Sequence, residues 1–151
     1  MTTDNLDILS NTAIETLERF AFLMGNPPDN AEASPALPPR LWLVTLTFTG
    51  ARTGVIALAT TPDLARQAAA NLYSLEPSEI TEEQAADALK ELLNVTTGDY
   101  LHELEGNEPI FDLAAPALTA LDRVEFKRQW AGRPQVTLNV EGQPLWLGFG
   151  S

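Results

Sequence analysis

The chain has 151 residues and a mass of 16.4 kDa, a length that predicts a single domain over residues 1–151 with a core of its own. It contains no cysteine, which excludes disulfides, thiolate nucleophiles and cysteine-ligated metal sites. Nine basic residues against twenty-one acidic ones give a formal net charge of −12, which disfavours binding to nucleic acid or to anionic membrane surfaces.

The N-terminal sequence and the hydropathy pattern predict a cytoplasmic protein. Residues 1–20 are acidic and lack the basic region and apolar core of a signal peptide. No apolar run approaches the ~20 residues that a membrane-spanning helix needs. We therefore expect no contact with a membrane.

The first predicted element is an amphipathic helix over residues 6–24, where apolar residues recur at three- and four-residue spacing. Gly25 is expected to end this helix in the left-handed conformation, and Pro27 and Pro28 prevent its continuation. Residues 25–40 contain five prolines and predict a connector between elements.

A β-hairpin is predicted next. Residues 41–49 alternate between two sets of side chains and are rich in β-branched and aromatic types, which indicates a half-buried strand. Residues 50–54 supply the turn glycines, and residues 55–60 form the return strand.

Two helices follow the hairpin. Thr61 is the predicted N-cap of a helix that has Pro62 in its first position and runs to about Tyr73. After a break at Pro77 and Ser78, a long helix is predicted over residues 81–104, beginning with a capping box between Thr81 and Gln84.

The last part of the chain is predicted to be mostly β-structure. Residues 107–122 give no decisive pattern, and three β-type runs follow at 123–130, 135–141 and 145–149. Short glycine and proline turns between the runs indicate an antiparallel meander. Because the helices are not interleaved one per strand, the predicted fold class is α+β, an antiparallel sheet with helices packed on one face.

The negative charge is concentrated in residues 76–112, which hold eleven acidic residues and one basic residue, Lys90. Two interpretations of this segment remain open. It can be a solvated helical face, or a face that meets a cationic group on a partner.

The long predicted helix has two distinct faces. Its core stripe consists of Ala85, Leu89, Leu92, Leu93, Thr96, Tyr100 and Leu104. The opposite face carries Asp87, Glu91, Asn94 and Gly98, with His102 to one side. Gly in a helix interior costs ~1 kcal/mol relative to Ala, and Asn also lowers helix stability. Three explanations of these costs stay open: a contact surface for a partner, neutral variation at Asn94, and a neighbouring element at Gly98.

Glu91 and Asn94 form a Glu-x-x-Asn pair that small residues and Gly98 follow, within the stretch ALKELLNVTTGDYLHEL. This stretch resembles the corresponding helix of the CheX/CheC-type chemotaxis phosphatases. The order of elements also resembles that family, from a first helix ending in FAFLM to the hairpin, the long helix, a segment near Pro116 and closing strands. The resemblance covers most of the chain by layout and residues 88–98 by motif.

The resemblance implies a phosphatase that hydrolyses the aspartyl-phosphate of a response-regulator receiver such as CheY, in chemotaxis or another two-component pathway. It implies that Asn94 orients the attacking water and that Glu91 pairs with a lysine of the receiver. Asp87 and Gly98, on the same face, are expected to contact the partner. We expect no metal or cofactor in this chain, since the Mg²⁺ belongs in the receiver. The alternative is a non-catalytic module that docks a receiver or a flagellar partner.

Two positions depart from the family pattern. CheC-type members have a second Glu-x-x-Asn in the first helix, whereas here Glu18 follows Glu15, so the single-site CheX-like arrangement fits better. Asp99 stands where many members have Asn, which leaves the identity of the receiver open.

Other chemistry has little support in the sequence. His102 is the only histidine, and neither a metal site nor a serine triad around it has the expected spacing. The three tryptophans, Trp42, Trp130 and Trp146, are predicted to be core or interface anchors and not a stacking platform for bases.

Residues 144–149 predict an apolar strand at an edge of the sheet. Exposed apolar edges pair with other chains, and CheX-like proteins are similar in using sheet edges to form homodimers. We therefore expect a homodimer through this strand, which Leu145→Lys or Leu147→Lys should disrupt. The alternative is that Trp146 and Phe149 cover the core of a single subunit.

Overall fold

The computed structural model describes residues 3–28, 37–106 and 110–150. Its described elements are α1 (Thr3–Ala21), β1 (Gly25–Asn26), β2 (Arg40–Gly50), β3 (Gly54–Thr60), α2 (Pro62–Tyr73), the 3₁₀ turn η1 (Pro77–Glu79), α3 (Glu82–Glu105), β4 (Phe111–Leu113), β5 (Ala117–Asp122), α4 (Arg123–Trp130), β6 (Gln135–Val140) and β7 (Gln143–Phe149). None of these helices is long and apolar enough to cross a membrane.

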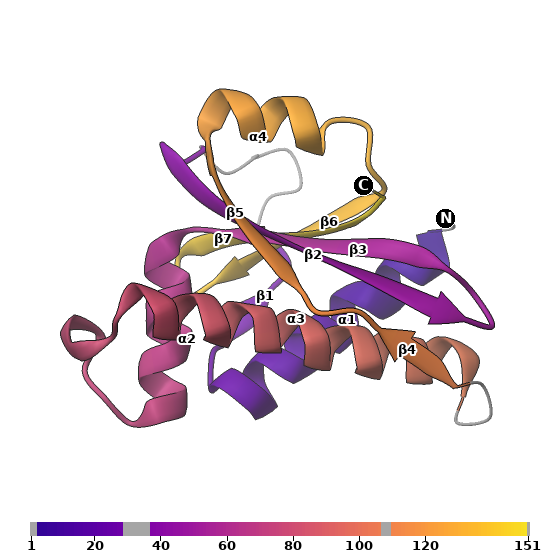
Figure 1. Cartoon of the computed structure of the whole chain (residues 1–151), viewed down its shortest axis with the longest axis horizontal. Helices are drawn as coiled ribbons and strands as arrows, with labels where there is room; N and C mark the ends of the chain where they lie inside the picture. The colour runs from indigo at the N-terminus through magenta and orange to yellow at the C-terminus, as the bar shows by residue number, and fades with distance from the viewer. Residues whose placement is uncertain (1–2, 29–36, 107–109, 151) are drawn as a thin grey trace.

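The seven strands form one sheet in the order β1-β6-β7-β3-β2-β4, and β5 also pairs with β2. Every strand pairing in it is antiparallel. Helices α1, α2 and α3 cover one face of the sheet, and α4 lies alone on the other (Figure 1). The α+β class with an antiparallel sheet is therefore confirmed, with one helix more than predicted on the second face.

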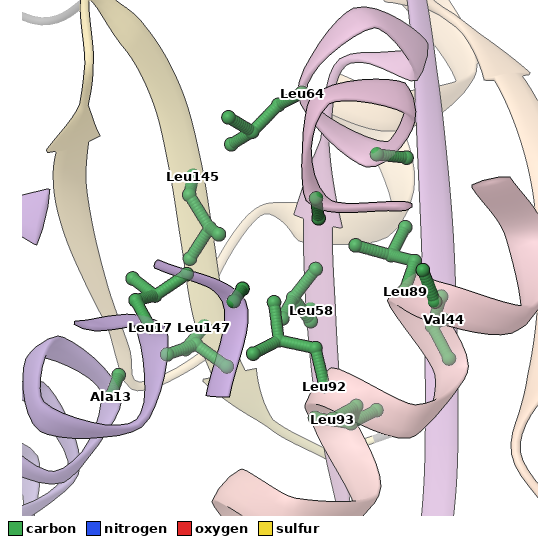
Figure 2. Close-up of a cluster of buried hydrophobic side chains, with 14 of the residues drawn as sticks. Ala13, Leu17, Val44, Leu58, Leu64, Leu89, Leu92, Leu93, Leu145 and Leu147 are labelled. Carbon is green, nitrogen blue, oxygen red and sulfur yellow. The ribbon is translucent and has the colours of Figure 1, made fainter. Parts of the chain in front are cut away.

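The main core lies between the sheet and the three helices. Figure 2 shows side chains from every layer meeting there: Ala13 and Leu17 of α1, Leu64 of α2, Leu89, Leu92 and Leu93 of α3, and Val44, Leu58, Leu145 and Leu147 of the sheet. All of these side chains are at most 3% exposed. Burial of so much apolar surface is the main force that holds α3 on the sheet.

Strand β2 is buried on both faces over much of its length and is not the half-buried strand that its alternation predicts. Trp42 and Val44 belong to the core under the three helices, whereas Leu41 and Leu43 belong to the smaller core under α4. The second face is covered because α4 packs over it.

Residues 123–130 form helix α4 and not the predicted strand. Asp122 caps the helix by accepting a hydrogen bond from the Glu125 N–H at 2.8 Å, and the Glu125 side chain accepts one from the Asp122 N–H. Phe126 and Trp130, one turn apart, stack on each other, and Phe126 packs on Trp146 with ring centroids 5.0 Å apart. Phe126 and Trp130 are four residues apart, so a helix places both on the face that packs against the sheet. This packing decides the conformation of residues 123–130 in spite of their β-type alternation.

The end of α1 also differs from the prediction. The helix stops at Ala21, and Phe22, not Gly25, takes the left-handed conformation with φ +56°. Gly25 pairs with Val140 of β6, and a Cβ at this position would lie 3.0 Å from Leu17 Cδ1. Any side chain at this position would press on Leu17, and glycine avoids that contact where β1 approaches α1. The remainder of the predicted connector, residues 29–36, lies outside the described residues.

Strand β7 lies inside the sheet, between β3 and β6, so the predicted edge position of residues 144–149 is wrong. Leu145 is 1% exposed and Leu147 is fully buried, because both strand pairing and the three helices enclose them. Trp42, Trp130 and Trp146 are also buried, which confirms them as core residues.

The position of β7 generates a stability prediction. Leu147→Ala should lower the free energy of unfolding by ~2–5 kcal/mol, because it leaves a cavity in the main core. The matched control is Val124→Ala on α4, where the side chain is 64% exposed and the change should stay within ~0.5 kcal/mol. Urea unfolding followed by circular dichroism measures both, and equal effects of the two substitutions would contradict the assignment of β7 to the interior.

Candidate functional site

Helix α3 positions the candidate site. Thr81 accepts a hydrogen bond from the Gln84 N–H at 3.1 Å and the Gln84 side chain accepts one from the Thr81 N–H at 3.0 Å, so the predicted capping box is confirmed. The predicted core stripe is buried as well, except that Leu104 is only half-buried. Burial raises the pKa of Tyr100 in this stripe, against a smaller opposing effect of the nearby Arg52. Tyr100 is therefore a neutral core residue at physiological pH.

The opposite face of α3 is open to solvent. Asp87, Glu91 and Gly98 are exposed and Asn94 is half-buried, in one row along the helix. No hydrogen bond or ion pair joins the side chain of Glu91 or Asn94 to any residue that the structure describes. A carboxylate and an amide one turn apart are thus available to a partner molecule.

An open depression of ≈410 Å³ lies beside this row. Its helix side consists of Asp87, Lys90, Glu91 and Asn94, and its other wall is the segment Leu113–Pro116, from the last residue of β4 to the residue before β5. The Ala114 N–H donates to the Thr47 carbonyl at 2.9 Å, which ties this wall to β2. The sequence pattern of residues 107–122 gave no indication of this wall, although its small side chains and Pro116 suit a segment that leaves space beside a helix.

Gly98 faces open space. A Cβ built at this position meets nothing within 4 Å, so no neighbouring element of the described chain requires a glycine. One explanation that the sequence left open for Gly98 is thereby removed, and a contact surface for a partner becomes the better explanation.

Asp99 does not belong to this open face. Its carboxylate forms an ion pair with Arg19 of α1 and accepts a hydrogen bond from the Thr16 hydroxyl at 3.3 Å. The residue that departs from the family pattern therefore joins α3 to α1. Such a pair at the surface contributes no more than ~1 kcal/mol to stability.

His102 lies exposed near the end of α3, and within the described ranges no three histidine, aspartate or glutamate residues are grouped so that they could hold a metal ion. A larger hollow of ≈660 Å³ lies elsewhere, near the start of α2 and the end of β5. It combines both signs of charge, and Arg66 there donates to the Ile80 carbonyl at 3.1 Å. We place the candidate site on α3 in spite of the smaller volume beside it, because the side chains of Glu91 and Asn94 have no partner in the described chain, whereas Arg66 in the larger hollow is already hydrogen-bonded.

The family model described as the chemotaxis phosphatase CheX matches residues 43–139. No curated protein matches the chain in sequence. Among solved structures, the chain is similar to a CheX protein of Desulfovibrio desulfuricans, with 14% identity, a TM-score of 0.69 and coverage of 97% of this chain and 98% of that one.

Two further structures extend this likeness. A Borrelia burgdorferi protein in a CheX–CheY–BeF₃–Mg²⁺ complex is 16% identical, with a TM-score of 0.69 and coverage of 99% of this chain and 98% of that one. A CheC-like superfamily protein of a Shewanella species is 17% identical, with a TM-score of 0.60 and coverage of 100% of both chains. At such low identities these likenesses show the fold, and the site must be argued from this chain's own residues.

The open space around Gly98 generates a second stability prediction. Gly98→Ala should raise the free energy of unfolding by ~0.5–1 kcal/mol, since alanine suits a helix interior better and its methyl group meets no neighbour. Gly148→Ala is the control, because its Cβ would lie 3.2 Å from the Pro134 carbonyl oxygen and from the Trp130 ring. Thermal unfolding compares the two variants, and a loss of stability in Gly98→Ala would show that packing in this chain requires the glycine.

Proposed function

Because the chain belongs to the chemotaxis phosphatase CheX family, we propose that it hydrolyses the aspartyl-phosphate of a response-regulator receiver domain of the CheY kind. One observation carries the proposal: Glu91 and Asn94 stand uncommitted on the exposed face of α3, beside an open depression. The similar Borrelia protein in complex with CheY supports a receiver as the partner. In this proposal the chain acts in the cytoplasm, where the receiver is.

In the proposed mechanism Asn94 enters the site of the receiver and orients a water molecule for in-line attack on phosphorus. Its amide offers both a donor and an acceptor, and it stays neutral at every physiological pH. Hydrolysis of an acyl phosphate depends mainly on the position of the water and on neutralisation of charge. A single amide on a rigid helix can therefore supply what the receiver lacks.

Glu91 has the role of a docking residue in this proposal. Its carboxylate lies one turn before Asn94 and would form a charge-assisted hydrogen bond with a lysine of the receiver. Asp87 extends the acidic row, and Gly98 lets the partner backbone approach α3 closely. The Mg²⁺ is proposed to be held by the receiver.

Asn94→Ala should reduce the hydrolysis rate at saturating receiver by ~10²-fold, because the water is no longer oriented. Folding should be retained, since the side chain has no partner in the described chain. The measurement is phosphate release from a phosphorylated receiver of the same organism, with Gln129→Ala on α4 as the control for loss of an exposed amide. Unchanged hydrolysis in Asn94→Ala would exclude its catalytic role.

Glu91→Ala should instead raise KM for the receiver by about tenfold with a smaller change in kcat, because a charged contact of docking is lost. Glu103→Ala removes an exposed carboxylate from the same helix outside the site and should leave both constants unchanged. If the unaltered protein binds the receiver without accelerating hydrolysis, the alternative of a non-catalytic docking module is correct.

We further propose a homodimer, formed through β5 in place of β7. Strand β5 pairs with β2 on one side, and no described strand pairs with its other side. Residues 117–121 contain no charge and no proline to protect this edge. A second copy of the chain can therefore add its own β5 and extend the sheet.

Light scattering tests the homodimer: we expect a mass near twice the chain mass of 16.4 kDa. Thr119→Lys places a charge on the exposed edge and should give a monomer with unchanged circular dichroism. Thr137→Lys, at a half-buried position of β6, is the control and should not alter the mass. A mass of one chain for the unaltered protein would contradict the dimer.

A further inference from the structure

Lys90 is the single basic residue between Glu76 and Asp112, a segment with eleven acidic residues. The substrate of the proposed reaction is itself an anion, since an aspartyl-phosphate carries negative charge on its phosphoryl oxygens. Charges act over ~10 Å at an ionic strength of 0.1 M, so the acidic residues of α3 oppose the approach of that anion. A cation at the site itself would offset this repulsion.

The geometry places Lys90 at the site. It lines the ≈410 Å³ depression together with Glu91, Asn94 and the segment Leu113–Pro116. At about 100° of rotation per residue, Asn94 lies between the directions of Lys90 and Glu91 when the helix is viewed along its axis. Asn94 is therefore flanked by a cation on one side and by an anion on the other, and all three residues line the depression.

The ammonium group of Lys90 has no partner in the described chain. Asp87 and Glu91 are its neighbours on α3, but neither forms an ion pair with it. Two other basic residues do pair across elements, Arg19 with Asp99 and Arg52 with Glu105. Lys90 is half-buried and unpaired, so its charge is available to an incoming group.

We infer that Lys90 is a substrate-binding residue, which contacts the anionic oxygens of the receiver's phosphorylated aspartate while Asn94 orients the water. The inference rests on the proposed function and adds a specificity determinant to it. Glu91 and Lys90 present opposite charges on the two sides of Asn94. A receiver with a cation and an anion in the complementary positions docks in one orientation only.

The experiment uses the full chain and phosphorylated receivers of its own organism. Lys90→Ala should raise KM about tenfold with little change in kcat, Lys90→Glu should raise it further, and Lys90→Arg should restore it. The control is Lys127→Ala, because Lys127 is the only other lysine and lies exposed on α4, on the opposite face of the sheet. Unfolding curves of all four variants should match that of the unaltered protein.

A binding measurement identifies the group that Lys90 contacts. Lys90→Ala should weaken binding to the phosphorylated receiver about tenfold and leave binding to the unphosphorylated receiver unchanged. If Lys90→Ala weakens binding equally to the phosphorylated and the unphosphorylated receiver, or if Lys90→Glu leaves KM unchanged, the inference is wrong. The proposed function still holds in that case, provided that hydrolysis depends on Asn94. If the unaltered protein accelerates hydrolysis of none of these receivers, the proposed function fails and the inference with it.

Discussion

The packing of α3 against the sheet is the interaction on which the candidate site depends. Nine buried residues hold the helix in one rotational setting, and a slip by one residue would turn its outer face by about 100°. The directions of Glu91 and Asn94 are therefore fixed by Leu89, Leu92 and Leu93 beneath them. Glu91 and Asn94 lie on a helix that is capped at its N-terminus and packed against the sheet. The docking surface is therefore already formed before a partner binds, and binding requires little ordering of side chains or backbone.

The sequence predicted α3 well because the signals for it are local. The capping box between Thr81 and Gln84 fixed its start, and the spacing of apolar residues separated the core stripe from the Glu91–Asn94 face. Strand β7 and helix α4 depend on distant partners. An apolar strand at the chain's end fits an edge or the middle of a sheet equally well, and only its pairing with β3 decides between them. The wall at Leu113–Pro116 was not predicted for the same reason: it becomes part of the site only because the fold places it opposite α3.

The two departures from the family pattern have different physical meanings. Glu15 and Glu18 are exposed on α1, and because Glu18 stands where the motif has its Asn, this helix lacks the Glu-x-x-Asn pair that the long helix carries. Asp99 is compensated within the chain, because Arg19 of α1 supplies the opposite charge. A carboxylate in place of an amide thus contributes to the junction of two helices and leaves the outer face of α3 unchanged. The departure at Asp99 is therefore structural, and the identity of the receiver has to be sought in the residues around Asn94.

Asn94 and Gly98 both lower the intrinsic stability of α3, and nothing in the described chain is gained in return, since one side chain is unpaired and the other position faces open space. Asp87 and Glu91, which have no partner in the described chain, add repulsion near Asn94, and Lys90 is the basic residue beside them. A helix held by its buried stripe can tolerate these costs, amounting to ~1–2 kcal/mol for the two residues together. Asn94 and Gly98 thus destabilise α3, and both lie on its exposed face. Residues that lower the stability of their own helix are expected where the surface serves to bind another molecule. The arrangement of Asn94 between Lys90 and Glu91 is consequently the feature of this surface that best indicates which receiver it binds.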